Sequence, residues 1–509
     1  MERPPGARLR LRPATPGPAR GKGGVLTSPA AMAARLTAFL VAVIVGISVV
    51  AGLIVGAQRE ADPAVDLLIY NGRVYTGDPS APIAEAVAVR GNRILKVGTN
   101  REIKRLRRNA ATVIDAHGGS VLPGFADTFV ALPTQAEAIA GAHRLGLTTI
   151  GAIVDDLAAF DALSAVATTS DHPMRISAAL KVKLPLSPAA ATELKARRTL
   201  AASALVRLDA LAFEITLPPV KPVRPAARRG SPPPLLPNDE QQALLALDQE
   251  GWPLVLHVDD ERELATALDV VARLIETNPT PAGGRRHRLA LAHPMPLDTA
   301  RLATLGLTVS MPLPATWTGV SVAREIEPPA PGALASTSPA SRTASAAVAT
   351  TAPASAAAVA ASPTAASPAV VPAHDPAALP FSFPLPAGVR LVMGSDVVAD
   401  PRLGLQALVS SVAAAGAASE DEDGEGQPVD RALVTNALAT LTTGPAQVLG
   451  AGSEWGLIAP DRLADLVVLS ADIFDLPASH LLDAVVTATV VDGKVVYDRD
   501  ADTPPPPTP

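Results

Sequence analysis

The sequence predicts an α/β fold flanked at both ends by antiparallel strands. Between residues 134 and 311, helical patterns alternate with short apolar strand patterns, as expected for repeated βα units. Hairpin turn signals stand before this region, at Asn71-Gly72 and Gly91-Asn92, and after it, at Asp492-Gly493. At 509 residues the chain is long enough for one large α/β barrel with accessory elements, or for about two to four ordinary domains.

Composition argues against several classes of function. A net charge of -6 and an aromatic content of 3% argue against a nucleic-acid partner, which requires clustered Lys and Arg and usually stacking rings. The chain has no cysteine, which rules out disulfide scaffolds, Cys-ligated zinc, iron–sulfur clusters and thiol nucleophiles. Its 51 prolines indicate long extended or unfolded pieces.

The amino-terminal segment is predicted to be a membrane anchor. Residues 1–35 are rich in Pro, Gly and Arg and are expected to form a disordered cytoplasmic tail. Residues 36–57 carry no charge and are long enough to cross a hydrocarbon core of about 30 Å as a helix. Basic residues precede this stretch, so the positive-inside rule predicts a single-pass plasma-membrane protein with its larger part, beyond a linker at 58–65, outside. The alternative is a signal peptide cleaved after Val55-Gly56-Ala57, which makes the protein secreted.

Short apolar strands fill residues 66–121. The hairpin signals between them predict an antiparallel set. A basic helix at 102–108 interrupts the strands and is interpreted as a solvated surface. The expected strands are 66–70, 73–75, 86–89, 93–97 and 112–115.

Alternating helices and strands follow. The expected helices are 134–146, 156–165, 193–202, 239–250 with Asn238-Asp239 as its cap, 261–276 and 297–305; the expected strands between them are 148–154, 176–181, 254–258, 288–292 and 307–311. Two inserts interrupt this pattern. Residues 217–237 are proline-rich and extended, and residues 327–378 are rich in Ser, Thr, Ala and Pro, cannot bury a core and are expected to be disordered.

The stretch from Leu122 to Leu132 resembles the first barrel strand of the amidohydrolase superfamily. Members carry Pro-Gly-Phe-Ile-Asp-x-His-x-His there, and the two histidines bind a catalytic metal. In this sequence the two histidine positions are Phe129 and Ala131. The segment from Gly456 to Leu469 resembles the family's closing motif, Gly-x-Ile-x-x-Gly-x-x-Ala-Asp-Leu-Val.

This resemblance covers about residues 66–497 apart from the two inserts, and it closely follows the branch known as amidohydrolase family 3. It implies a distorted (β/α)8 TIM-type barrel over residues 122–450. Beside the barrel it implies a small β-sandwich split between residues 66–121 and 451–498. A disordered tail is expected at 499–509.

The resemblance also assigns the remaining site positions. Gly251-Trp252 followed by His257 matches Gly-Trp-x-x-x-x-His, so His257 stands where members have a metal ligand. Gly394-Ser395-Asp396 matches Gly-Ser-Asp, whose aspartate is both ligand and general base. Leu291 stands where Arg-Ile-Glu-His supplies another ligand. Two substitutes are available: His293, two residues further on, and Glu214, near the place of the residue that bridges metals in many members.

Two retained ligands, His257 and Asp396, are fewer than the three or more that a catalytic zinc normally has. The retained residues also have structural interpretations: His257 as a buried histidine bonded to Asp396 or to a backbone carbonyl, and Asp396 as a turn-stabilising aspartate. The sequence therefore predicts a pseudoenzyme without a metal cofactor. Its old pocket, which binds a small-molecule ligand, is expected to be lined by His257, Asp396, Phe129, Ala131 and Leu291. Scaffolding of envelope proteins through residues 217–237 is the other non-catalytic role considered.

Two further interpretations stay open. One is a hydrolase of C–N or ester bonds in which Asp396 is the catalytic base. It works without the usual metal or with one divalent metal, such as zinc, bound by His257, Asp396 and either His293 or Glu214. The other is a purely structural spacer in the cell envelope.

Overall fold

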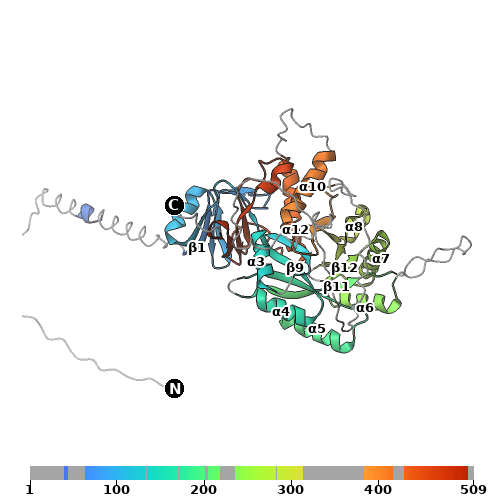
Figure 1. Ribbon diagram of the computed structural model, residues 1–509. Helices are drawn as coiled ribbons and strands as arrows, with labels where there is room; N and C mark the ends of the chain where they lie inside the picture. The colour runs from blue at the N-terminus through green and yellow to red at the C-terminus, as the bar shows by residue number, and fades with distance from the viewer. Residues whose placement is uncertain are drawn as a thin grey trace, which may run out of the picture. The chain divides into compact units, whose positions relative to one another are not determined.

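Parallel strands of the computed structural model form a nearly closed eight-stranded barrel (Figure 1). The structure describes residues 39–43, 64–132, 135–169, 172–200, 205–217, 236–281, 284–312, 383–415 and 429–502. The strand order in the sheet follows the chain order, as expected when each strand is connected to the next by a crossover on the outside. The barrel strands are β8 (Phe125–Val130), β9 (Leu147–Val154), β10 (Arg175–Lys181), β11 (Val206–Glu214), β12 (Leu254–Val258), β13 (Arg288–Leu291), β14 (Thr308–Met311) and β15 (Arg390–Met393).

The barrel closes where the end of β15 meets β8. The backbone N–H of Asp396 donates to the carbonyl of Phe129 at 2.8 Å, and the N–H of Ala131 donates to the carbonyl of Asp396 at 2.8 Å. Val130 and Asp396 form a parallel bridge between these two bonds. The turn after the last strand therefore completes the hydrogen bonding of the first strand.

Helices cover the outside of the barrel (Figure 1). The six helices predicted between residues 134 and 305 are confirmed, with shifts of at most five residues at their ends; the largest is in the helix expected at 193–202, which begins at Pro188. The sequence pattern did not single out β11 as a strand over its full length, because Arg207 and Asp209 interrupt its apolar residues. The helices are α3 (Ala136–Arg144), α4 (Leu157–Ala167), α5 (Pro188–Leu200), α6 (Asn238–Gln249), α7 (Glu261–Thr277), α8 (Thr299–Leu305), α10 (Pro401–Ala415), α11 (Arg431–Ala439) and α12 (Thr443–Val448).

The predicted cap of α6 is wrong. The helix already includes Asn238, and Pro237 holds the N-cap position without a side-chain hydrogen bond. Proline lacks a side-chain acceptor, but its fixed φ prepares the chain for the first helical turn. Elsewhere the expected chemistry is present: the Asp260 carboxylate accepts the N–H groups of Arg262 and Glu263 at the start of α7.

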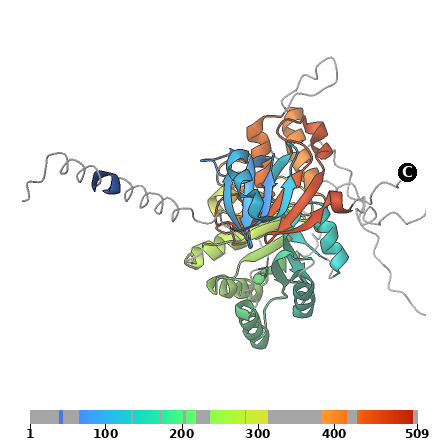
Figure 2. The same cartoon turned by 90° about the vertical axis from the view of Figure 1, so that its left-hand side faces the viewer.

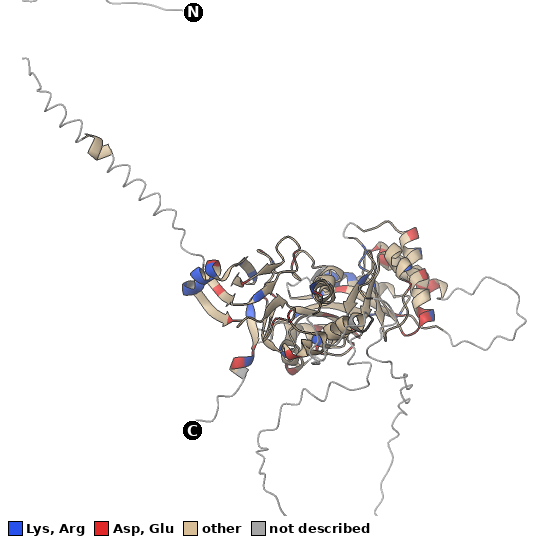
Figure 3. Cartoon of the chain, turned by 90° about the horizontal axis from the view of Figure 1, so that it is seen from above, with Lys and Arg blue, Asp and Glu red and all other residues tan. Residues whose placement is uncertain are grey.

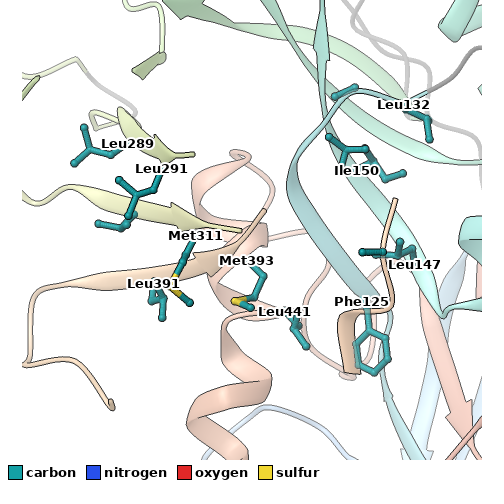
Figure 4. Close-up of a cluster of buried hydrophobic side chains, with 14 of the residues drawn as sticks. Phe125, Leu132, Leu147, Ile150, Leu289, Leu291, Met311, Leu391, Met393 and Leu441 are labelled. Carbon is teal, nitrogen blue, oxygen red and sulfur yellow. The ribbon is translucent and has the colours of Figure 1, made fainter. Parts of the chain in front are cut away.

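Apolar side chains separate into an outer and an inner set. The outer faces of the strands pack against the helices in one large buried cluster, which includes Leu289 and Leu291 and is partly drawn in Figure 4. The inner set fills the lumen with smaller side chains, and Phe129 packs against it; its members are Ile153, Ala179, Ala210, Ala212, Val255 and Ala290. The lumen is therefore a packed interior rather than a channel.

Strands from both chain ends build a second, two-sheet structure. The four-stranded sheet has the order β5-β4-β1-β6, and the six-stranded sheet has the order β18-β17-β16-β7-β2-β3. Figure 2 shows the late strands, in red, beside the early strands, in blue. The strands are β1 (Val65–Tyr70), β2 (Arg73–Tyr75), β3 (Ile83–Ala84), β4 (Ala86–Arg90), β5 (Arg93–Gly98), β6 (Ala110–Asp115), β7 (Ser120–Pro123), β16 (Leu466–Leu469), β17 (Val486–Val491) and β18 (Lys494–Asp498).

Apolar residues from both sheets meet in one buried cluster, so the two sheets pack face to face as a sandwich. Short helical segments border it: α2 (Asn100–Ile103), η1 (Lys104–Asn109) and α13 (Arg499–Asp502), whereas η3 (Ala478–Asp483) packs against α10 of the barrel. Because α13 is helical, the predicted disordered tail is wrong for its first residues, 499–502. Figure 3 shows both Lys/Arg and Asp/Glu on the helices between residues 64 and 502.

Two turn predictions are confirmed and one is wrong. Gly91-Asn92 connects the antiparallel strands β4 and β5, and Asp492-Gly493 connects β17 and β18. Asn71-Gly72 does not make a hairpin, because β1 and β2 belong to different sheets. The Asn71 amide instead donates to Asp115 at 2.9 Å, and a Cβ on Gly72 would lie 2.6 Å from Val121. The set is also not purely antiparallel, since β1 pairs with β6, and β2 with β7, in parallel.

Residues 39–43 belong to a separate unit, residues 1–63, and are helical with exposed side chains. Among the described residues, no helix is long and apolar enough to cross a membrane. The predicted span at 36–57 lies outside them apart from residues 39–43. The same holds for the tail at 1–35, the insert at 327–378 and all but the edges of the insert at 217–237.

A buried ion pair joins the barrel to the sandwich. Arg175 of β10 donates from Nε to the Asp465 carboxylate at 2.6 Å, and both side chains are 2% exposed. The same carboxylate accepts the N–H of Asp492 at 2.8 Å, and the Asp465 carbonyl accepts the N–H of Gly124 at 2.9 Å. Asp465 therefore holds together the start of β8, the start of β10 and the last hairpin.

We expect Asp465→Ala to lower the free energy of unfolding by about 3–5 kcal/mol, because it leaves the buried Arg175 guanidinium with only the partly exposed Asp492 carboxylate, at 3.4 Å. Chemical denaturation measures this difference. Asp161→Ala is the control, since it removes an exposed ion pair with Arg197 and should cost less than about 1 kcal/mol. Equal effects of the two substitutions would contradict the proposed role of Asp465.

Candidate functional site

The predicted site residues lie at the carboxyl ends of the barrel strands. His257 is on β12, Glu214 is the last residue of β11, and Asp396 follows β15. The carboxyl ends of parallel strands meet on one face of a barrel, where functional side chains of such folds gather. The structure therefore brings these three residues to the same face.

His257 is half-buried, with 27% of its side chain exposed. The ring of Phe129, from β8 across the lumen, stacks on it with a centroid distance of 5.3 Å and an interplanar angle of 6°. Nδ1 of His257 lies 3.5 Å from the carboxylate of Asp259. The charged neighbour of the imidazole is therefore Asp259, whereas the sequence favoured Asp396 or a carbonyl.

The neighbours of His257 on the adjoining strands are Glu214 and Ala290. Both pair in register with His257, so all three side chains point to the same side of the sheet. Glu214 is exposed and Ala290 is buried in the lumen. One carboxylate and one methyl group thus flank the imidazole.

Leu291 does not join this group. It lies one residue beyond Ala290 and packs in the outer cluster with Leu289, as Figure 4 shows. Successive residues of a strand face opposite sides, so only one of the two can share the face of His257. The motif comparison placed Leu291 at the site because it counted residues along the chain and could not read which side of β13 they face.

The other predicted positions lie at the rim. Ala131 is exposed just after β8, and its N–H is bonded to Asp396. His293 is partly exposed beyond the end of β13, with Nδ1 3.1 Å from the Pro294 carbonyl oxygen. Asp396 is exposed and has φ of +63°, a left-handed conformation that aspartate tolerates better than most residues.

The amidohydrolase resemblance implies a metal at this face, and the side chains present decide whether it fits. In the part of the chain that the structure describes, no group of three or more His, Asp or Glu side chains is placed to hold a metal ion. Phe129 and Ala290 place a ring and a methyl group beside His257. A catalytic zinc ordinarily has three protein ligands, so the described residues do not fit it.

Beneath the rim, Asp127 links β8 to the turn after β15. Its buried carboxylate accepts the N–H groups of Phe129 and Ser395, each at 3.1 Å, and contacts the Ser395 hydroxyl. That hydroxyl also contacts the carbonyl of Val397 and has a single hydrogen. A protonated Asp127 satisfies all partners, by donating to Ser395 while Ser395 donates to Val397.

Burial raises the pKa of Asp127 to about 7, and the nearby charge of Asp396 adds to this, while the hydrogen bonds from Ser395 and Phe129 oppose it. Asp127 and Ser395 stand inside the two motifs quoted from the sequence, yet neither was predicted to have a role of its own. An aspartate within a short, buried and mostly apolar strand was the signal that could have identified the first.

A family model described as amidohydrolase family matches residues 132–497, which is more than half of the chain. The chain belongs to the amidohydrolase family. One curated relative, the protein LONG AFTER FAR-RED 3 of Arabidopsis thaliana, is 39% identical over 67 residues, which are 13% of this chain and 12% of that protein. The matched stretch is thus a small part of the relative.

Two solved amidohydrolase-fold structures resemble this family member over most of its length. An adenosine deaminase from Xanthomonas campestris with bound zinc has a TM-score of 0.52 and 16% identity, covering 86% of this chain and 93% of that one. The atrazine chlorohydrolase TrzN from Arthrobacter aurescens, complexed with zinc, has a TM-score of 0.50 and 16% identity, covering 85% and 96%. At such identity the likeness shows the fold alone.

We expect the stability of this amidohydrolase-family protein to depend on pH through Asp127. The folded state keeps a proton on Asp127 up to about pH 7, while the unfolded chain loses it near pH 4. The stabilising contribution is therefore complete below about pH 4 and is lost as the pH rises through about 7. Asp127→Asn, which stays neutral, should remove this contribution.

The measurement is the difference in melting temperature between Asp127→Asn and the parent protein from pH 4 to pH 8. The difference is needed because burial lowers the pKa of His143 to about 4, which makes the parent less stable as the pH falls. The variant should gain stability relative to the parent as the pH rises. A difference that is constant with pH would refute the buried proton.

Proposed function

We propose that this chain is a pseudoenzyme of the amidohydrolase family. It is a membrane-anchored protein of the cell envelope that keeps the family barrel and binds a small-molecule ligand in the old pocket. The observation that carries the proposal is the stack of Phe129 on His257, with 5.3 Å between the ring centroids. An aromatic ring occupies one of the two positions that the resemblance assigns to metal-binding histidines.

The chemistry around His257 supports a binding role over metal hydrolysis. A zinc ion needs nitrogen, oxygen or sulfur donors at about 2.0–2.3 Å. Neither the carbons of Phe129 nor the methyl group of Ala290 can supply one, which leaves Glu214 and Asp259 beside the imidazole and Asp396 on the far rim.

The lining of the pocket favours a ligand with an apolar body and a polar end. Small apolar side chains, such as Ala179, Ala212 and Ala290, are packed in the lumen and form the floor beneath the rim. The rim itself is polar: besides His257, it holds an exposed ion pair of 2.7 Å between Lys181 and Asp155 at the ends of β10 and β9. Pockets of this kind bind ligands through apolar contact and orient them with a few polar groups.

The envelope location rests on residues 36–57, which we propose as the anchor with the barrel on the outer side. The proline-rich segment at 217–237 is the proposed contact for envelope proteins if the chain has a scaffolding role.

The alternative function is a hydrolase of C–N or ester bonds with one metal at His257, Asp396 and either Glu214 or His293. Glu214 favours it over a metal-free enzyme, because it pairs in register with His257.

Elemental analysis of the purified full-length protein distinguishes these functions. For a pseudoenzyme we expect zinc, nickel and manganese well below one equivalent per chain, and unchanged in His257→Ala and Asp396→Ala. Asp400→Ala is a matched control, because Asp400 pairs with Arg402 near the same rim. One equivalent of metal, lost in both site variants and kept in the control, would favour the hydrolase and overturn the proposal.

The anchor is tested by labelling introduced cysteines, because the natural chain has none to give a background signal. Ala162→Cys places a thiol on the exposed surface of α4, and Ser28→Cys places one in the predicted cytoplasmic tail. We expect a membrane-impermeant maleimide to label Ala162→Cys in intact cells and Ser28→Cys only after permeabilisation. Labelling in the reverse order would exclude the proposed topology.

A further inference from the structure

A second pocket lies at the opposite end of the barrel from His257. It has a volume of about 170 Å³ and is formed by the end of α5, the end of α6 and the segments that lead into β12 and β13. Its lining residues are Arg198, Asp248, Gly251, Trp252, Pro253, Pro281, Gly284, Arg285, Arg286 and His287. The volume is below the roughly 300–1,000 Å³ of pockets for drug-sized ligands, which indicates a small ligand.

On one wall of this pocket the charged side chains neutralise one another. The buried carboxylate of Asp248 accepts two hydrogen bonds from Arg285, at 3.0 and 3.1 Å, and one from Nε2 of His287 at 2.9 Å. The other ring nitrogen of His287, Nδ1, accepts the backbone N–H of Leu254 at 3.1 Å. One guanidinium therefore balances one carboxylate, and this wall has no charge left for a ligand.

The other wall carries excess positive charge. Arg198 lies over the ring of Trp252 at 4.3 Å and donates to the carbonyl of Gly251 at 3.0 Å. Among the described residues no carboxylate lies within 4.0 Å of it. The nearby Glu250 is already paired with Lys195 at 2.8 Å.

The next carboxylate is Asp209, and several groups share it. Arg286 lies 3.4 Å from Asp209, which also accepts the hydroxyl of Ser177 at 2.7 Å. Arg288, 1% exposed inside the barrel, relies on the same charge, and its Nε has no partner among the described residues. Arg198, Arg286 and Arg288 thus all face Asp209, and Arg198 also feels the charge of the more distant Glu250.

Burial and mutual repulsion both act on the pKa values of these guanidinium groups. Burial lowers the pKa of Arg198, and the positive charge of Arg286 adds to the decrease. Burial also lowers the pKa of Arg288 to about 10. An anion beside them offsets the repulsion, and arginine is well suited to oxyanions because its planar fork donates two parallel hydrogen bonds.

We propose that this pocket binds a phosphate group, free or as a phosphomonoester, between the guanidinium groups of Arg198 and Arg286. Arg198 has no carboxylate within 4.0 Å among the described residues, and Arg286 shares Asp209 with its neighbours, so this wall carries a net positive charge that an oxyanion balances. The ring of Trp252 packs against the Arg198 guanidinium and holds it in place. The backbone of Gly450 lies close to Arg286, because a Cβ on Gly450 would be only 2.3 Å from Nη1 of Arg286. The site is independent of the ligand pocket at the carboxyl ends of the strands.

Thermal unfolding of the purified full-length protein tests the proposal. It is followed in increasing inorganic phosphate, glycerol phosphate or acetate, with ionic strength held constant by sodium chloride. A ligand that binds only the folded state raises the melting temperature in a saturating way. We expect this for phosphate, for glycerol phosphate or for both, and the stronger of the two identifies the source. A response to acetate alone, or to none, would overturn the proposal.

Arg198→Gln and Arg286→Gln should each weaken phosphate binding about tenfold or more, because each removes charged hydrogen bonds. The control is Arg197→Gln. Arg197 immediately precedes Arg198 on α5, pairs with Asp161 at 2.7 Å and does not line the pocket. Its affinity should match that of the parent. If Arg198→Gln does not fold, Arg198→Lys replaces it, and equal phosphate affinity in Arg286→Gln, Arg198→Lys and the parent would refute the site.

Discussion

Closure of the barrel between β8 and β15 is the constraint on which the site depends. The Asp396 backbone bonds to Phe129 and Ala131, and the buried Asp127 carboxyl bonds to Ser395 one layer below. These contacts give the Pro-Gly-Phe-x-Asp and Gly-Ser-Asp segments a structural task that needs no metal. A chain can keep both segments to hold its first and last barrel strands together, even where the positions between them carry a phenyl ring and a methyl group.

The contact between barrel and sandwich also depends on a segment that resembles the family. Asp465, from the closing Ala-Asp-Leu-Val segment, binds Arg175 with both side chains 2% exposed, and it also holds Gly124 at the entrance to β8. Removing either partner of such a buried pair is costly, because the other loses its main compensating charge. The segments that most resemble the family are thus those that connect elements distant in the sequence.

Local signals predicted local structure well. Gly91-Asn92 and Asp492-Gly493 make the hairpins that their turn chemistry favours, while Asn71-Gly72 carries the chain from one sheet to the other. The dipeptide supplies the left-handed backbone in each case, but pairing also depends on which strand lies alongside. The prediction that Leu291 lines the pocket was wrong for a related reason. Motif spacing counts residues, whereas the face of β13 on which a residue lies is set by its register with His257 on β12.

The sequence by itself determined the alternation of helices and strands, the two-ended sandwich and the family, because these follow from periodicity, turn residues and motifs read along the chain. Only the tertiary structure decided which side chains meet: Phe129 with His257, Asp127 with Ser395, and Arg198 and Arg286 around one small pocket. Such contacts join residues far apart in the chain, and their energy depends on distance, burial and facing direction, which exist only once the strands are in register.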